Sequence, residues 1–407
     1  MAKTFSGEAP PPDESIPLKL IPSSNRYSIW FFCIVNFLWW ISLYLYVPLL
    51  PVYIQSTGAN LDVVGAVLSA YAIPQVLLRI PIGIWSDRLG KRKPLVGAGI
   101  VFTSVGALGL GLAKTPWLLF LARMTTGVGA ATWVVFPVYF TAYYPADDSG
   151  RAIGLINFVR SVALIAATAG GGLMAEKLGL RSPYFFAALF GISALPALLT
   201  TKESPMSKMP VASWVNFRSV VTRPLLIAIS AMAILLTFTT FAGVFGFVPV
   251  YAAGLGASSS ELGLITMINL VFAALGALGA AWVWERVGYR STIIWSALLI
   301  GASLFATPFI STTIVLMSVQ IALGLGSGVL STMFMTLGIR GLPREQQATA
   351  MGVFQAIYAI GMLAGPIVSG LLGSNRGLSD VFFLAGSVGL LIATLALLPI
   401  FSRSNLH

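Results

Sequence analysis

Three arginines, Arg79, Arg123 and Arg160, stand inside long apolar stretches of the sequence. An arginine at the centre of a bilayer costs about 2.5–3.5 kcal/mol on insertion scales, so each should face a cavity or a partner helix. No Asp or Glu falls in the middle of an apolar stretch, which leaves Arg123 and Arg160 without an obvious buried counter-charge. The pattern predicts an electropositive cavity that prefers anionic or acidic-headed substrates. It does not support proton coupling through a central carboxylate.

The residue sets that catalysis needs are missing from these stretches. The only histidine is His407 and the only cysteine is Cys33, so we expect no metal site, no internal disulfide and no histidine-based catalysis. No nucleophile–base set is visible in the apolar stretches. The glycine-rich segment 324–328 lacks the following Lys-Ser/Thr of a phosphate-binding loop. The sequence therefore predicts a protein that is not an enzyme and that uses no cofactor.

The composition indicates which elements position the arginines. Of the 407 residues, 57% are hydrophobic and 9% are charged, whereas about a quarter of a soluble domain is charged. The formal net charge is +11, but no aromatic-basic platform or metal-finger spacing indicates nucleic-acid binding. A lipid bilayer is the solvent that suits this composition, because side chains that face lipid need not be polar.

Apolar windows of about 20 residues, each long enough to cross about 30 Å of hydrocarbon, recur along the chain. They predict an all-α membrane protein with twelve transmembrane helices, at residues 27–54, 61–85, 94–112, 117–144, 152–175, 183–200, 224–251, 261–284, 291–310, 313–339, 347–372 and 381–401. Long apolar runs without polar alternation argue against a β-barrel. The predicted divisions are a cytosolic tail (1–26), a six-helix bundle (27–200), a cytosolic linker (201–223), a second six-helix bundle (224–401) and a cytosolic tail (402–407).

An internal repeat supports the division into two bundles. A shift of 198 residues aligns Pro51-Val52-Tyr53 with Pro249-Val250-Tyr251, and it also aligns Gly58-Ala59 with Gly256-Ala257, Gly65 with Gly263, Gly90 with Gly288, and Gly154 with Gly352. Two parallel repeats about an axis along the membrane normal would form pseudo-symmetric halves. Substrate is then expected between the halves near mid-membrane, with access alternating as the halves rock.

The distribution of basic residues predicts the orientation in the membrane. Of the 24 Lys and Arg residues, only Lys114, Lys177, Arg181 and Arg376 fall in predicted outer segments. Apart from the three arginines within the helices, the remaining basic residues lie in the tails, the linker and the inner loops. This bias places both termini in the cytosol. We expect a multi-pass protein of the plasma membrane, which in a bacterium is the inner membrane.

The segment 83–93 joins the second and third predicted helices and contains Gly83, Asp87, Arg88, Gly90 and Arg92. Asp87 can pair with an arginine or cap a helix N-terminus, Gly83 permits close helix approach, and Gly90 permits a tight turn. The spacing resembles the G-x-x-x-D-R-x-G-R-R signature of the major facilitator superfamily. The resemblance implies the fold of that family and a conformational latch in this loop. A basic anchoring loop is the alternative.

Two further segments resemble motifs of the same family. Residues 123–131 are similar to its R-x-x-x-G-x-G-A-A motif, which implies a role for Arg123 in substrate or proton handling. Gly365 and Pro366 resemble part of its antiporter motif, G-x8-G-x3-G-P-x2-G-G, although the family carries that motif in the fifth helix and this chain has it in the eleventh. Both residues should make a bend that lets helices pack closely and pivot. Arg79 lies near an inner helix end, where it can snorkel, and we expect it to act in structure or gating rather than in substrate contact.

Other polar and aromatic side chains are candidates for the cavity wall. They are Arg160, Asn36, Trp40 and Tyr44 in the first half, and Asn269, Gln320, Gln355 and Tyr358 in the second. Helical spacing puts Asn36, Trp40 and Tyr44 on one face. The alternative for each residue is packing, or a hydrogen bond to a neighbouring helix.

Residues 47–53 resemble the L-P-x-x-P-x-Y end of the first helix in the twelve-helix drug and metabolite exporters of the family. The resemblance implies secondary active efflux, such as antiport, of an amphipathic or anionic small molecule. Uptake of an anionic metabolite by symport or exchange is the alternative, and a non-transporting sensor or scaffold is an alternative of another class. The expected partners are the substrate, protons or another coupling ion, and the lipid bilayer. We expect a monomer that binds no nucleic acid.

Overall fold

The computed structural model describes residues 23–145, 148–203 and 220–401. Within these ranges every regular element is helical, and twelve helices are long and apolar enough to cross a membrane. The predicted all-α membrane fold is therefore confirmed. The predicted tails and most of the predicted linker lie outside the described residues.

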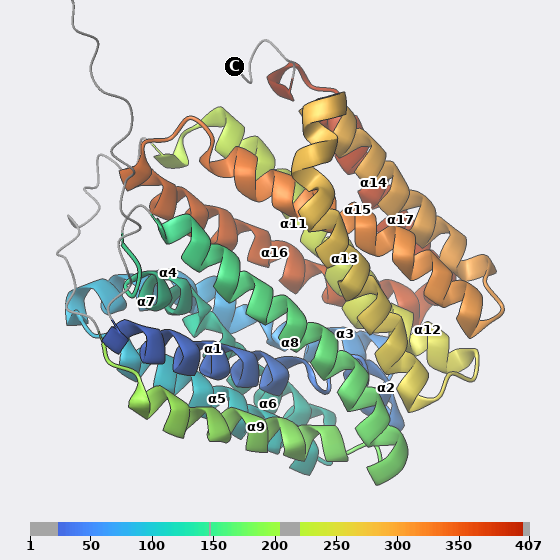
Figure 1. Cartoon of the computed structure of the whole chain (residues 1–407). Coiled ribbons are helices and arrows are strands. Elements are labelled where there is room, and N and C mark those ends of the chain that lie inside the picture. Colours follow the sequence, from blue (N-terminus) through green and yellow to red (C-terminus); the bar gives the residue numbers. More distant parts are fainter. Residues whose placement is uncertain (1–22, 146–147, 204–219, 402–407) are drawn as a thin grey trace, which may run out of the picture.

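Figure 1 shows the helices. In the first half they are α1 (Ser23–Tyr44) with α2 (Leu50–Ser56), α3 (Leu61–Ala70) with α4 (Ala72–Leu89), α5 (Lys93–Leu112), α6 (Pro116–Ala131) with α7 (Val135–Thr141), α8 (Ser149–Leu178) and α9 (Ser182–Thr200). In the second half they are α11 (Pro224–Ala242) with α12 (Val248–Gly254), α13 (Ser259–Val287), α14 (Tyr289–Ala306), α15 (Thr313–Ile339), α16 (Arg344–Arg376) and α17 (Leu378–Leu395). Short helical turns cover Thr132–Val134, Gly243–Phe247, Thr307–Phe309 and Pro399–Phe401.

The two halves repeat individual contacts within one residue of the 198-residue offset that the sequence predicts. The Tyr53 hydroxyl donates to the carbonyl of Ala113 at 3.1 Å, and the Tyr251 hydroxyl donates to that of Ile310 at 2.8 Å. At the other end of the bundle, the Lys93 ammonium donates to the Leu199 carbonyl, and the Arg290 guanidinium donates to the Leu397 carbonyl, each at 2.8 Å. The repeat is thus a repeat of packing as well as of sequence.

The halves meet through two glycine crossings that are related by the same offset. In the α3–α16 crossing, a Cβ on Gly65 would stand 2.1 Å from the Pro366 carbonyl oxygen. In the α8–α13 crossing, a Cβ on Gly263 would stand 2.5 Å from the Thr168 carbonyl oxygen. Small residues let helix backbones approach this closely in a membrane protein. Both crossings lie toward the end of the bundle that holds α2 and α12, which we call the closed end.

Hydrogen bonds link the halves beside both crossings. The Ser374 hydroxyl donates to the Asp62 carboxylate at 3.1 Å, and the Glu176 carboxylate accepts the Ser260 backbone N–H at 3.0 Å. From the closed end, α8 and α13 diverge toward the opposite end of the molecule (Figure 1). We call this opposite end, which carries the 83–93 segment, the open end.

Candidate functional site

Arg123 is held against aromatic rings of its own half. The helix α6 begins at Pro116 after Thr115, whose hydroxyl accepts the N–H of Leu118 as an N-cap, and this start places Arg123 two turns inside the helix. The guanidinium lies 4.2 Å from the centre of the Tyr71 ring and donates to the Tyr46 hydroxyl at 3.3 Å. The electron-rich ring face stabilises the cation. No Asp or Glu is among the buried residues of the described chain, so no buried carboxylate there neutralises Arg123.

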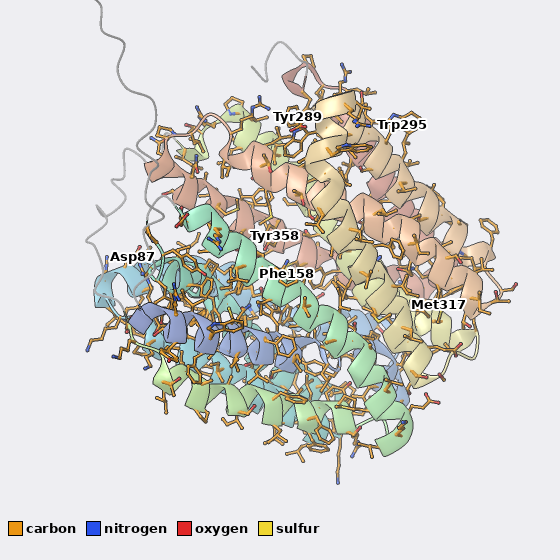
Figure 2. All side chains as sticks on the ribbon, viewed as in Figure 1. Asp87, Phe158, Tyr289, Trp295, Met317 and Tyr358 are labelled. Atoms are coloured by element: carbon orange, nitrogen blue, oxygen red, sulfur yellow. The ribbon has the colours of Figure 1, made fainter. Side chains whose placement is uncertain are left out.

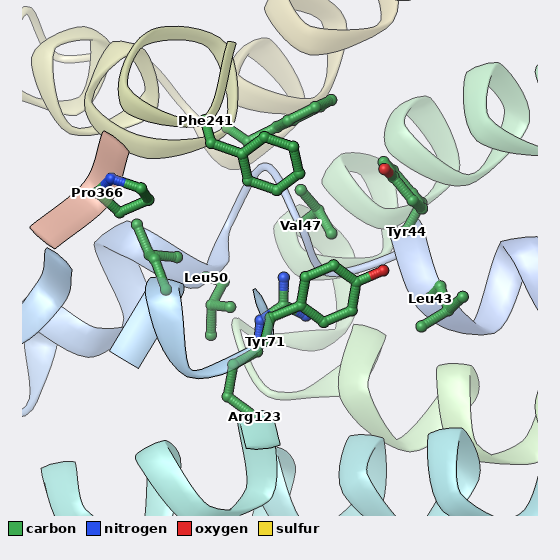
Figure 3. Close-up of a pocket in the computed structure, with 10 residues that line it drawn as sticks. Leu43, Tyr44, Val47, Leu50, Tyr71, Arg123, Phe241 and Pro366 are labelled. Carbon is green, nitrogen blue, oxygen red and sulfur yellow. The ribbon is translucent and has the colours of Figure 1, made fainter. Parts of the chain in front are cut away.

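A pocket between the halves opens beside Arg123 (Figure 3). Its lining is Leu43, Tyr44, Val47, Leu50, Leu68, Tyr71 and Arg123 from the first half, and Phe241, Phe245 and Pro366 from the second. About 10 Å³ of it is free, which is room for about one water molecule. The pocket is therefore the floor of the closed end, and a substrate would have to bind farther toward the open end.

Arg160 lies on α8, on the same side of the interface as Tyr44. The side chain is half-buried, and its guanidinium carbon lies 5.2 Å from the centre of the Trp40 ring. The Nε atom of Arg160 is buried and has no hydrogen-bond partner among the described residues. The Trp40 ring packs on the Tyr44 ring with their centres 5.7 Å apart, and Tyr44 lines the pocket together with Arg123. The structure therefore brings three predicted residues, Arg160, Trp40 and Tyr44, together near Arg123.

Arg79 joins the two halves. Its guanidinium donates to the Gln355 carbonyl of α16 at 3.1 Å and to the Gln75 side chain, and its carbon lies 5.5 Å from the centre of the Tyr358 ring. The side chain is only 7% exposed, so the prediction that Arg79 snorkels to the membrane surface is wrong. It turns inward because the facing half offers a carbonyl and an aromatic face. A gating role for Arg79 stays a prediction.

Tyr358 and Gln355 face this arginine from α16. Tyr358 is half-buried and lies in the middle of the molecule (Figure 2). Its ring packs edge-to-face on Phe354. The side-chain oxygen of Gln355 is buried and has no partner among the described residues. Both predicted residues are thus at the interface between the halves.

Three other predicted cavity residues hold helices together. The buried Asn36 amide donates to the Ile156 carbonyl at 3.0 Å, which ties α1 to α8. The Asn269 amide donates to the Gln320 side-chain oxygen at 3.3 Å, which ties α13 to α15. None of the three lines the pocket beside Arg123. The alternative predicted for these residues, a hydrogen bond to a neighbouring helix, is thus present, whereas a role in the cavity wall stays a prediction.

The predicted pivot residues of α16 pack closely on other helices. A Cβ on Gly365 would stand 2.8 Å from the Phe238 carbonyl oxygen of α11. Pro366 contacts Gly65 through its carbonyl and lines the pocket. The close packing predicted for this segment is present, whereas the pivoting motion stays a prediction.

The 83–93 segment lies at the open end of the molecule, where Figure 2 labels Asp87. Gly90 has φ of +60° and ends α4, as the tight turn requires. Asp87 and Arg88 are exposed, and Arg92 is buried. Burial lowers the pKa of the Arg92 guanidinium below its usual value, and the carboxylates of Asp87 and Glu203 partly offset this.

One expectation for this segment is wrong in the structure. Gly83 was predicted to permit a close helix contact, but no atom lies within 4 Å of a Cβ built there. The role of the segment as a latch stays a prediction.

Sequence reasoning missed Glu203, which follows α9. Its carboxylate accepts the backbone N–H of Arg92 and of Lys93, so it caps the start of α5 from the segment that follows α9. Lys93 in turn donates to the carbonyls of Leu199 and Thr201. The position of an acidic residue directly after a predicted helix, beside a basic loop, was the available signal.

We expect Glu203→Ala to lower the free energy of unfolding by about 1 kcal/mol, as the loss of an N-cap does. Glu203→Gln should cost about half as much, because the amide oxygen can still accept one N–H. Thermal unfolding of the detergent-purified protein measures both values. Glu285→Ala removes an exposed carboxylate at a helix end and serves as the control. Equal melting temperatures for the Glu203 and Glu285 variants would contradict the capping role.

The sequence also gave no reason to select Tyr71, Phe241 and Phe245, which line the pocket, or Tyr46, which accepts a hydrogen bond from Arg123. Aromatic residues in a membrane helix pack in the interior or at the interface more often than they bind a ligand. Only their position around Arg123 distinguishes them from the other aromatic residues.

Comparisons with known proteins agree with this architecture. A family model described as Major Facilitator Superfamily matches residues 32–256 and 231–404. An uncharacterized MFS-type transporter of Methanocaldococcus jannaschii is 22% identical over 92% of this chain and 98% of its own length. Multidrug resistance protein 1 of Bacillus subtilis is 23% identical over 81% of this chain and 85% of its own length.

Among solved structures, a bacterial homologue of the human lysosomal transporter Spinster, in an inward-facing and unoccupied conformation, superimposes with a TM-score of 0.79. It shares 17% sequence identity and covers 92% of this chain and 96% of that protein. At this identity the likeness shows the fold.

Proposed function

The chain belongs to the major facilitator superfamily, and we propose that it exports an anionic or amphipathic small molecule by alternating access, driven by an ion gradient. The observation that carries the proposal is the set of three arginines between and beside the halves, with no buried Asp or Glu in the described chain to neutralise them. Such a cavity attracts anions and repels cations.

The arrangement of the helices supports entry of the substrate from the open end. The contacts between the halves run from the closed end to Arg79, and the helices diverge beyond it. The distribution of Lys and Arg favours a cytosolic position for the open end. Of the three arginines only Arg160 is partly exposed, and access to it from the cytosol would suit the loading step of an exporter. The name of the Bacillus subtilis relative, a multidrug resistance protein, also supports export.

Exchange of one anion for another is the second candidate, and it includes uptake of an anionic metabolite. The same lack of a buried carboxylate in the described chain favours it, because no acidic side chain is placed to carry a proton through the centre of the membrane. In that mechanism a second anion on the arginines would replace the proton as the coupling ion.

Transport by the full-length protein in liposomes tests the proposal. We expect aliphatic and aromatic carboxylates to cross, with rates that a pH gradient changes by about tenfold if protons drive export. Under exchange, the rates should instead depend on an anion preloaded on the far side. Cationic dyes such as ethidium are the control and should cross no faster than in empty liposomes. Transport of ethidium without transport of any anion would refute the proposal.

A further inference from the structure

The charge in the membrane interior belongs to one half of the molecule. Arg79, Arg123 and Arg160 all lie in the first half. The positions 198 residues later, which are their counterparts in the repeat, hold Ala277, Ile321 and Tyr358. The pseudo-symmetric backbone therefore carries a cationic wall on one side and a neutral, partly aromatic wall on the other.

Only one of the three arginines is left without a hydrogen bond. Arg123 donates to Tyr46, and Arg79 donates to Gln355 and Gln75. Arg160 donates to no residue in the part of the chain that the structure describes, and its Nε atom is buried. A guanidinium that is half-buried, charged and unpaired has strong unused capacity to bind a carboxylate or a similar oxyanion.

The opposite wall offers aromatic surface. Tyr358, the repeat counterpart of Arg160, is half-buried on α16. Across the interface, Arg160 stands over the Trp40 ring at 5.2 Å, and Trp40 packs on the Tyr44 ring with their centres 5.7 Å apart. The Tyr44 ring in turn contacts the Phe245 ring of the second half, with their centres 5.7 Å apart, so a row of aromatic rings leads from Arg160 to the second half.

We infer that the substrate is an aromatic monoanion, whose single acidic group binds Arg160 and whose ring packs against Tyr358 and Phe245. This inference rests on the proposed function and sharpens its substrate class. One guanidinium without a hydrogen bond matches one acidic group, since the other two arginines already donate to acceptors within the protein. The aromatic wall then selects a flat ring over a flexible chain, because two rings pack at low entropic cost.

Binding of 2-naphthoate to the detergent-purified full-length protein, measured by titration calorimetry, tests the inference. Wild-type protein should bind 2-naphthoate about tenfold more tightly than its neutral analogue 2-naphthamide or its saturated analogue, decahydronaphthalene-2-carboxylate. It should also bind 2-naphthoate more tightly than naphthalene-2,6-dicarboxylate, which brings a second charge against the aromatic wall. Equal affinity for the acid and the amide would overturn the inference.

Variants of Arg160 and Tyr358 measure separately what each wall contributes to binding affinity. Arg160→Gln should weaken 2-naphthoate about tenfold and leave 2-naphthamide unchanged, and Arg160→Lys, which keeps the charge, should weaken 2-naphthoate about threefold. Tyr358→Leu should weaken both ligands, whereas Tyr358→Phe should weaken neither. Arg181→Gln is the matched control: it removes one exposed positive charge at the closed end and should change nothing. Unchanged 2-naphthoate binding in both Arg160 variants would overturn the inference.

The liposome assay distinguishes failure of this inference from failure of the proposed function. Transport of some other anion that Arg160→Gln leaves intact would uphold export and refute the aromatic-monoanion site. Conversely, Arg160-dependent binding of 2-naphthoate without transport of any compound in liposomes would uphold the site and refute the transport proposal.

Discussion

Valine at Gly65 should reduce transport by about tenfold or more, because it prevents the closed end from forming. A Cβ at this position would stand 2.1 Å from the Pro366 carbonyl oxygen and 3.0 Å from the Gly370 Cα. Both are backbone atoms that cannot rotate away, so α3 and α16 would have to separate. Overpacking of this kind costs about 1–3 kcal/mol or more, which corresponds to roughly a 5- to 150-fold shift away from the closed-end conformation. Gly263→Val, its repeat counterpart in the α8–α13 crossing, should have the same effect.

Transport rates in liposomes and spin-label distances measure this effect. Labels at Ser56 and Gly254, which are repeat counterparts at the closed end, should move apart in both valine variants. The chain offers a matched control pair, Gly154→Val and Gly352→Val. These positions lie on α8 and α16, are also separated by the repeat offset, and have no atom within 4 Å of a Cβ. If the Gly65→Val and Gly263→Val variants transport as fast as the two control variants, the glycine crossings do not form the barrier to substrate at the closed end.

Lysine at Arg123 should slow transport by about tenfold even though it keeps the positive charge. The guanidinium of Arg123 lies over the Tyr71 ring, 4.2 Å from its centre, and also donates to the Tyr46 hydroxyl. An ammonium group is a compact point charge and cannot make both contacts from one position. The loss of a desolvated cation–π contact is worth about 2 kcal/mol. Arg123→Gln should slow transport further, because it also removes the charge from the cavity.

Initial transport rates and melting temperatures separate a binding effect from an unfolding effect. Arg286→Lys makes the same chemical change at an exposed arginine, which lies 3.7 Å from the centre of the Trp282 ring. It should leave the transport rate within about twofold of wild type, because exposed cation–π contacts are worth about 0.5–1 kcal/mol and lie away from the cavity. A wild-type rate with lysine at position 123 would show that charge alone is sufficient there.

The sequence predicted the elements of this protein and their duplication. Lengths of apolar sequence near 20 residues indicated twelve helices, because backbone groups in a bilayer must be satisfied within each helix. The shift that pairs Gly65 with Gly263 predicted contacts that the structure repeats in both halves. Gly90 predicted a turn, and the arginines within the helices predicted polar surroundings in the interior. Each of these inferences depends on local chain chemistry or on a constant offset.

Only the tertiary structure decided which face of each helix meets the cavity. Asn36 and Gln320 proved to join helices, Gly83 has no close neighbour, and Arg79 crosses to the other half. In a soluble protein an apolar stripe would have marked the inner face of each helix. In a membrane protein, lipid and protein interior are equally apolar, so the sequence of a helix says little about its rotation around its own axis. That rotation is set by packing against neighbours far away in the sequence.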